Sequence, residues 1–232
     1  MGANQDRRIC PNRRCKNATT GPMNDWLGLD ITLTSSKICS IQELVNAHLR
    51  ARAEDVEDSL CDACSKHGKR PASTELLATP EVVVIVIHAV AALTDKEKKS
   101  GRTTMSYNTA PRKIVPQKVD YGLWLDLSRF QAPGYMTSRT ETKYQLSSVV
   151  FHSGLSFSSG HYSGIFRSAK SICRANDDHV EPANVAELLG QMNRRADTTP
   201  YILTYIRTPP KRADAAQSGV NPMPLKTGGR LL

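Results

Sequence analysis

The sequence predicts an α+β fold in which strands outnumber helices. A β-branched run at residues 81–87, alternating segments at 144–152 and 161–167, and a helix signal at 40–49 support this prediction. The chain has 232 residues, of which 39% are hydrophobic. It is therefore long enough for one large domain or for two smaller lobes.

The N-terminal part is predicted to be irregular before its first regular elements. Residues 1–24 mix Arg, Asn, Pro, Gly and Thr around two cysteines, so we expect a disordered stretch at 1–9 and a loop beyond it. Residues 26–33 alternate large apolar with small or polar side chains, which predicts a half-buried strand. Ser40 and Glu43 have the spacing of a capping box, which predicts a helix start. One helical face would then carry Ile41, Leu44, Val45, His48 and Leu49.

The middle of the chain is predicted to hold a central strand. Residues 81–87 follow Pro80 and are too rich in valine and isoleucine to favour a helix, and they are apolar on both faces. Residues 95–112 are polar and aperiodic, which indicates a solvated connection. A further strand is predicted over 119–127.

The C-terminal part is predicted to form a hairpin, a helix and a last strand. The two strands at 144–152 and 161–167 flank a Ser/Gly-rich turn, and residues 201–206 form the closing strand. Helical spacing at 182–195 involves Val185, Leu188, Leu189 and Met192. We expect a disordered tail at 208–232, which is poor in large apolar residues.

Charge and apolar patterning argue against nucleic acid and membranes as partners. The net charge is +9, but the basic residues are scattered apart from a cluster near the N-terminus, and aromatic residues make up only 6%. The longest apolar run, residues 82–93, is shorter than the roughly 20 residues of a membrane-spanning helix. Nor does the N-terminus resemble a signal peptide, since it lacks an apolar segment, or a myristoylation site, since Asp6 replaces the Ser or Thr of that motif.

Six cysteines without a signal peptide predict a reducing compartment, the cytosol or nucleus. Cys10-x4-Cys15 and Cys61-x2-Cys64 form two close pairs, and four thiolates of this kind hold structural zinc. Two pairs of free thiols without metal are the alternative, because the first spacing is loose. His67 is an alternative ligand, although an exposed loop histidine is favoured. Cys39 and Cys173 read as small buried residues.

A second group of residues surrounds the predicted hairpin turn. His152, Ser153 and Gly154 precede the turn, and Gly160, His161 and Tyr162 follow it. Glycines let backbone approach a ligand closely, and a histidine at the foot of a strand is held rigidly enough to act as a general base. Asn176 or Asp177 could fix its tautomer. Composition alone favours the interpretation that these histidine and asparagine side chains are ordinary surface groups with their hydrogen bonds satisfied.

The order of these motifs resembles that of the ubiquitin-specific proteases, the cysteine deubiquitinases. Four segments follow the family's final motifs, at residues 144–154, 160–162, 176–180 and 201–205. Upstream, the two cysteine pairs are similar to the family's zinc-bearing fingers, and residues 80–89 are similar to the strand before its Arg-Phe pair. Ala89 and Val90 replace that pair here. The resemblance covers about residues 10–207, the C-terminal two-thirds of the catalytic domain.

The resemblance implies a papain-like cysteine proteinase fold that hydrolyses ubiquitin C-terminal isopeptide bonds. Fingers would occupy about residues 10–75 and the palm about 76–207, and ubiquitin or ubiquitinated proteins would be the partners. His161 would be the general base and Asn176 the orienting residue, with Asp177 as a neighbouring helper. The segment around His152, Ser153, Gly154, Gly160 and Tyr162 would lie beside the ubiquitin tail. Cys10, Cys15, Cys61 and Cys64 would be the zinc ligands.

The resemblance also leaves the nucleophile unassigned. The family's Cys box, in the thumb, lies upstream of the fingers, and no segment of this sequence matches it. We therefore expect the thumb to be missing and the chain to be inactive alone, because an isopeptide bond is not cleaved by a base without a thiolate. A non-catalytic ubiquitin-binding module is the alternative function.

Overall fold

The structure is a computed structural model. It describes residues 1–10, 12–33, 39–50, 60–68, 70, 72–92, 112–114, 119–134, 142–154, 160–190 and 198–208. Most of the predicted connection at 95–112, the predicted tail beyond Thr208, the end of the helix predicted at 182–195 and the centre of the hairpin turn lie outside these residues.

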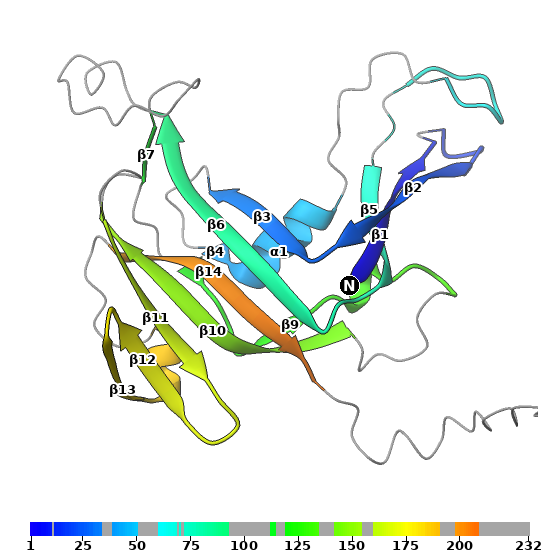
Figure 1. The fold of residues 1–232 in the computed structure, drawn as a ribbon. Coiled ribbons are helices and arrows are strands. Elements are labelled where there is room, and N and C mark those ends of the chain that lie inside the picture. The colour runs from blue at the N-terminus through cyan, green and yellow to red at the C-terminus, as the bar shows by residue number, and fades with distance from the viewer. Residues whose placement is uncertain are drawn as a thin grey trace, which may run out of the picture.

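A large mixed sheet dominates the described part of the chain (Figure 1). Its main path runs in the order β13-β12-β11-β10-β14-β6-β3, and β9 pairs with β10 and β7 with β6. Pairing along this path is antiparallel except for β3 with β6, which is parallel. The strands are β3 (Gly28–Leu33), β6 (Val82–Ala92), β7 (Arg112–Ile114), β9 (Trp124–Asp126), β10 (Lys143–Ser153), β11 (His161–Arg167), β12 (Ile172–Asn176), β13 (His179–Ala183) and β14 (Thr198–Arg207).

A separate small sheet holds the N-terminal strands beside the large one (Figure 1). It has the order β2-β1-β5, with β1 (Gly2–Ile9), β2 (Ala18–Trp26) and β5 (Ala72–Ala78). The prediction of disorder at 1–9 is therefore wrong, and so is the prediction of an irregular loop over 18–24, whereas residues 12–17 belong to no strand or helix, as predicted. Strand β1 pairs on both sides, so backbone hydrogen bonds order a segment that lacks an apolar period.

Helix α1 (Ile41–Leu49) confirms the predicted capping box, since Ser40 and Glu43 cap each other. Ile41, Val45 and Leu49 are buried on its inner face. Short elements complete the described structure: the parallel pair β4 (Cys39–Ser40) and β8 (Val119–Asp120), the 3-10 helix η1 (Ser128–Phe130) and helix α3 (Val185–Leu188). Within the described residues, no helix is long and apolar enough to cross a membrane.

The core lies between α1 and the centre of the large sheet. Strand β6 lies inside the sheet, as predicted, but next to the edge strand β3 rather than at the centre. It alternates buried residues such as Val83, Ile85 and Ile87 with partly exposed ones. Two fully buried tyrosines bridge loops to this core: Tyr144 donates its hydroxyl to the carbonyl of Pro80 and Tyr205 to that of Gly122. Buried hydroxyls are thus satisfied, as burial requires.

Two predicted elements differ from the structure. The strand expected over 119–127 is broken into β8 and β9, and residues 121–123 between them belong to no strand. Pro182 belongs to β13 rather than to a helix, and the helix begins later, behind its Asn184 cap. Because β13 is the sheet edge, the missing N–H of a proline is tolerated there.

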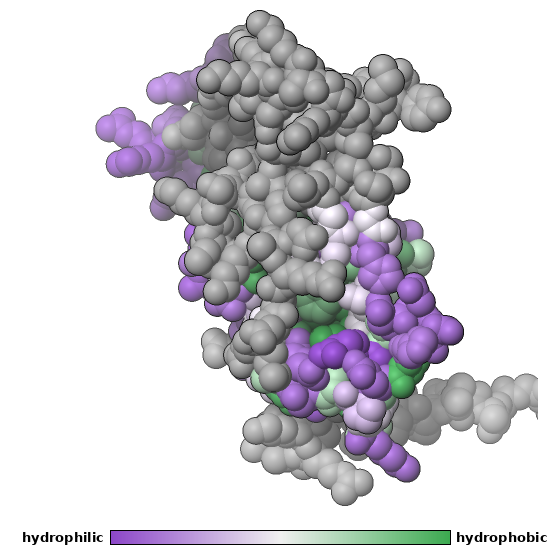
Figure 2. All heavy atoms as spheres, turned by 90° about the vertical axis from the view of Figure 1, so that its left-hand side faces the viewer, coloured by the Kyte–Doolittle hydropathy of each residue, from purple (hydrophilic) through white to green (hydrophobic). Residues whose placement is uncertain are grey.

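The described surface at the sheet's outer end is mostly hydrophilic. Figure 2 views the molecule from the left of Figure 1 and shows hydrophilic residues with smaller hydrophobic areas between them. Polar residues at a sheet edge discourage pairing with other chains.

Gly28 marks a close approach between β3 and β6. A Cβ at this position would lie 2.0 Å from the carbonyl oxygen of Val84. Gly28→Ala should therefore lower the free energy of unfolding by about 1–3 kcal/mol, as overpacking does. Chemical denaturation measures this. Gly21→Ala is the matched control, because its nearest neighbour would be 3.7 Å away. Equal stability of the two variants would contradict the assignment.

Candidate active site and metal centre

His161 and Asn176 meet at one end of the large sheet. Strand β11 begins at His161 and β12 ends at Asn176, and antiparallel pairing brings these ends together. Nε2 of His161 is hydrogen bonded to Oδ1 of Asn176, and a carboxylate oxygen of Asp177 lies 4.0 Å from the same nitrogen. An amide oxygen only accepts, so Nε2 carries the proton and Nδ1 is left as the proton acceptor.

The turn after Asn176 places the two aspartates. Asp177 has a φ of 53°, in the left-handed region that aspartate tolerates in tight hairpin turns. Asp178 pairs with His179 at 2.6 Å instead of with the site. Of the two orienting residues left open by the sequence, Asn176 makes the hydrogen bond and Asp177 lies beside it.

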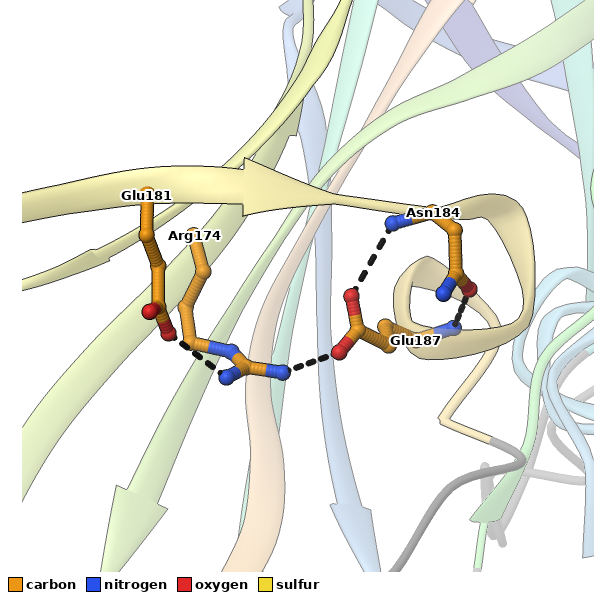
Figure 3. A network of polar contacts seen from close by, with 4 residues as sticks. All are labelled: Arg174, Glu181, Asn184 and Glu187. Carbon is orange, nitrogen blue, oxygen red and sulfur yellow. Dashed lines mark hydrogen bonds and ion pairs between the residues drawn. The ribbon is translucent and has the colours of Figure 1, made fainter.

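An Arg174 network fixes the hairpin that carries Asn176 (Figure 3). Arg174 bonds Glu181 on the neighbouring strand at 2.7 Å and also bonds Glu187 of α3. Glu187 in turn closes a capping box with Asn184, with bonds of 2.9 and 3.0 Å. The network therefore ties β12 and β13 to α3. Asn-Asp-Asp at 176–178 is the sequence signal that indicates the turn of this hairpin.

His152 is buried directly behind the site. Its side chain packs on Tyr162 with ring centroids 4.8 Å apart, and it is 2% exposed. A Cβ at Gly160 would lie 2.1 Å from its Nε2, so the backbone at Gly160 closes over the ring. Tyr162 continues to Tyr201 at 5.7 Å and Tyr201 to His88 at 6.4 Å. These rings form a row across β11, β10, β14 and β6.

The remaining predicted loop residues lie where the hairpin strands meet. Ser153 is opposite His161 in the register and bonds Thr198 at 2.7 Å. Gly154 has a φ of 140°, a conformation that favours glycine. Residues 155–159, between Gly154 and Gly160, lie outside the described part.

The four cysteines of the two pairs converge, although 46 and 54 residues separate the partners that meet. Their sulfurs all lie within 4.8 Å of one another, with Cys10 to Cys64 at 3.8 Å and Cys15 to Cys61 at 3.7 Å. A tetrahedral zinc with Zn–S bonds of about 2.3 Å separates its sulfurs by about 3.8 Å. The donor set and spacing therefore fit one zinc ion.

The Cys10-x4-Cys15 segment forms a turn similar to that of Cys61-x2-Cys64, although its cysteines are further apart in the sequence. The N–H of Cys10 donates to the carbonyl of Asn17, and that of Cys61 donates to the carbonyl of Lys66. The residue after the second cysteine is left-handed in both, with φ of 51° at Lys16 and 53° at Ser65. The two segments are thus equivalent knuckles, here called the first knuckle (residues 10–17) and the second knuckle (residues 61–66).

Local hydrogen bonds favour the thiolate form of the two cysteines in the second knuckle, which is the form that binds metal. Desolvation raises the pKa of Cys61, but backbone bonds from Ala63 and Cys64 outweigh it and lower that pKa to about 6. The backbone bond from Lys66 lowers the pKa of Cys64.

In the first knuckle the directions are opposite. Backbone bonds from Asn12 and Asn17 lower the thiol pKa values, but desolvation and neighbouring sulfurs outweigh these bonds. The pKa of Cys10 is therefore raised, and that of Cys15 is raised to about 12. Metal ligands must be deprotonated, so the thiols of the second knuckle are the ones favoured to bind first.

Cys173 and His67 have no part in this cluster. His67 is exposed, as favoured by the sequence. Cys173 is half-buried rather than buried, and the side chain of Cys39 lies outside the described residues. Cys173 pairs with Phe166, five residues along β11 from His161 and hence about 16 Å away along the strand. In the described part of the chain, no cysteine is hydrogen bonded to His161.

Desolvation lowers the pKa of His152, so this histidine is neutral in the fold. Its stabilising contribution is complete above about 6.5, the ordinary histidine pKa, and is lost as the pH falls toward its lowered pKa. The thermal midpoint of the wild type should therefore fall between about pH 7.5 and 5.5, and that of His152→Asn should fall less. The control His179→Asn removes an exposed histidine and should follow the wild type. A parallel decline in all three proteins would contradict this account.

Comparison with known proteins places the chain in a family. A family model described as ubiquitin carboxyl-terminal hydrolase matches residues 35–205. Over 173 residues the sequence is 25% identical to Ubiquitin carboxyl-terminal hydrolase 10 of Saccharomyces cerevisiae, covering 74% of this chain and 19% of that protein.

The fold is similar to chains in two solved structures. One is the SAGA Ubp8/Sgf11/Sus1/Sgf73 DUB module bound to ubiquitin aldehyde, with a TM-score of 0.66, 16% identity and coverage of 90% of this chain and 41% of that chain. The other is the module bound to monoubiquitin, with the same TM-score and identity and with coverage of 90% and 40%. This chain thus spans about a fifth of its curated relative and about two-fifths of the solved chains. Since the family model matches well over half of the sequence, the chain belongs to the ubiquitin carboxyl-terminal hydrolase family.

Proposed function

We propose that this chain supplies the general base and the ubiquitin-contacting surfaces of a ubiquitin-specific protease. The hydrogen bond from Nε2 of His161 to Oδ1 of Asn176 is the observation that carries the proposal. It leaves Nδ1 free to take a proton from an attacking thiol and later to return it to the departing amine. Asn176 keeps the ring in that tautomer, and Asp177 stabilises the positive charge on the protonated ring.

The two sheets correspond in this proposal to the parts of a papain-like ubiquitin-specific protease. The small sheet, with the cysteine cluster at its end, is the fingers, and the large sheet is the palm. Structures of similar fold contain ubiquitin aldehyde or monoubiquitin, which supports ubiquitin or ubiquitinated proteins as partners. The backbone at Ser153, Gly154 and Gly160 then lies beside the ubiquitin tail, next to His161.

The thiolate of this reaction comes, in our proposal, from outside the described residues. The cluster engages four cysteines in another sheet, and Cys173 is far along the strand from His161. We infer that the chain by itself does not cleave isopeptide bonds, because acyl transfer requires a nucleophile within hydrogen-bonding reach of its base. Cytosol or nucleus is the proposed location, with neither nucleic acid nor membrane as a partner.

Cys10, Cys15, Cys61 and Cys64 hold zinc in this proposal. A closed site with four thiolates supplies structural stability rather than reactivity. Its role is to join the first knuckle to the second, and so to shape the end of the fingers.

Reaction with a ubiquitin probe that carries a C-terminal cysteine-reactive warhead tests the proposed nucleophile. The purified chain should give no covalent adduct by intact mass and should still bind ubiquitin non-covalently. A covalent adduct would show that one of its own cysteines attacks, and Cys173→Ala would identify whether that residue is responsible. Absence of both adduct and binding would contradict the proposed ubiquitin contact.

A non-catalytic ubiquitin-binding module is the second candidate function, favoured by the distance of Cys173 from His161. Both functions predict that His161→Ala changes the ubiquitin Kd by no more than about twofold, because surface substitutions are usually worth under about 0.5 kcal/mol. They separate when the thiolate-bearing segment of a family member is added in trans. Turnover that appears in the wild type and is lost in His161→Ala supports the base, whereas no turnover supports the binding module.

Zinc content should be about one ion per folded chain, measured by native mass spectrometry. Cys61→Ser should abolish stoichiometric zinc and lower the thermal midpoint, and chelation of the wild type should do the same, because such sites contribute folding free energy. Cys173→Ser is the matched control and should retain the metal. Full-length folded protein without zinc would contradict the assignment.

A further inference from the structure

Two asparagine side chains cross between the knuckles. Asn12 belongs to the first knuckle, but its Nδ2 donates to the sulfur of Cys64 in the second, at 3.7 Å. Asn17 closes the first knuckle, and its Nδ2 donates to the sulfur of Cys61, at 3.8 Å. Each amide therefore contacts a different sulfur, and both bonds run in the same direction between the knuckles.

Further bonds fix the orientation of the Asn12 amide and the backbone position of Asn17. Oδ1 of Asn12 accepts from the backbone N–H of Arg14 at 3.2 Å, which turns its NH₂ group toward Cys64. The backbone carbonyl of Asn17 accepts from Cys10 at 2.8 Å, which holds Asn17 at the base of the knuckle. The x4 spacing is what admits Asn12 into the first knuckle, since an x2 turn has no room for this additional residue.

Charge gives these bonds a role. Four thiolates around one divalent ion leave a net charge of −2, and N–H donors to sulfur disperse this negative charge. Backbone N–H groups donate to the sulfurs of both knuckles. The side-chain amides of Asn12 and Asn17 add two donors that run from the first knuckle to sulfurs of the second. Donors that reach across also resist separation of the two knuckles.

We propose that Asn12 and Asn17 are positioning residues of the metal centre, which join the knuckles through amide-to-sulfur hydrogen bonds and raise the affinity of the four cysteines for zinc. This inference rests on the proposed zinc site. Outer-sphere partners of metal ligands typically contribute about 10–100-fold to metal affinity.

The test is a competition titration of the full chain against a zinc chelator, with Co²⁺ absorption as a second readout. The N–H donor is isolated by Asn12→Asp, which keeps the acceptor for Arg14 but puts a carboxylate oxygen against Cys64. Asn12→Ala and Asn17→Ala should each weaken zinc binding about tenfold, and Asn12→Asp should weaken it more than Asn12→Ala does. The Co²⁺ spectrum should retain four-thiolate character, because all four ligands remain.

Asn24→Ala is the matched control, since Asn24 is exposed and its side-chain amide donates to the nearby carbonyl of Pro22. It should leave zinc affinity unchanged. Equal affinity in the wild type and the Asn12 and Asn17 variants would overturn the inference while leaving the zinc site intact. Better binding by Asn12→Asp than by Asn12→Ala would also overturn it, because shape rather than the donor would then matter. No stoichiometric zinc in the wild type would overturn both proposals.

Discussion

The antiparallel pairing of β10 with β14 is the constraint on which the rest of the structure depends. Strand β10 also pairs with β11 and β9, and β14 also pairs with β6, so these two strands join the C-terminal hairpin to the middle of the chain. Leu146, Val149, Leu203 and Tyr205 bury their side chains along this pairing. Displacement of the register by one residue would turn those side chains outward.

The sequence predicted the parts of the fold that carry a strong local or apolar signal. Helix α1 has both its cap and its apolar face, β6 is rich in valine and isoleucine, and β14 is rich in tyrosine, isoleucine and threonine, so burial and propensity agree. Strand β1 could not be predicted because its residues are mostly polar and it is held by backbone pairing at the edge of the core. The small β12–β13 hairpin could not be predicted either, because most of β13 is exposed and so has no apolar pattern.

Spacing alone could locate the candidate site only in part. The predicted hairpin puts His161 at the start of a strand, where the structure also has it. The choice between Asn176 and Asp177 depended on which side chain faces Nε2, and that follows from the left-handed turn at Asp177. The cysteine pairs could be found from their spacing, whereas the amide donors of Asn12 and Asn17 could not. Contacts between residues 44 and 52 positions apart have no local signature.

The contact between the two knuckles also affects the order in which parts of the chain can fold. Cys15 and Cys61 are 46 residues apart, and the segment between them contains β2, β3 and α1. Closing a flexible loop of that length opposes folding by about 3 kcal/mol of chain entropy. If a metal ion joined the two ends early in folding, this loss of chain entropy would occur at that stage. Helix α1 would then pack against the sheet while it is part of a closed loop. Release of the ion would increase the conformational freedom of the segment that holds Ile41, Val45 and Leu49. Loss of the metal would therefore destabilise the hydrophobic core as well as the knuckles.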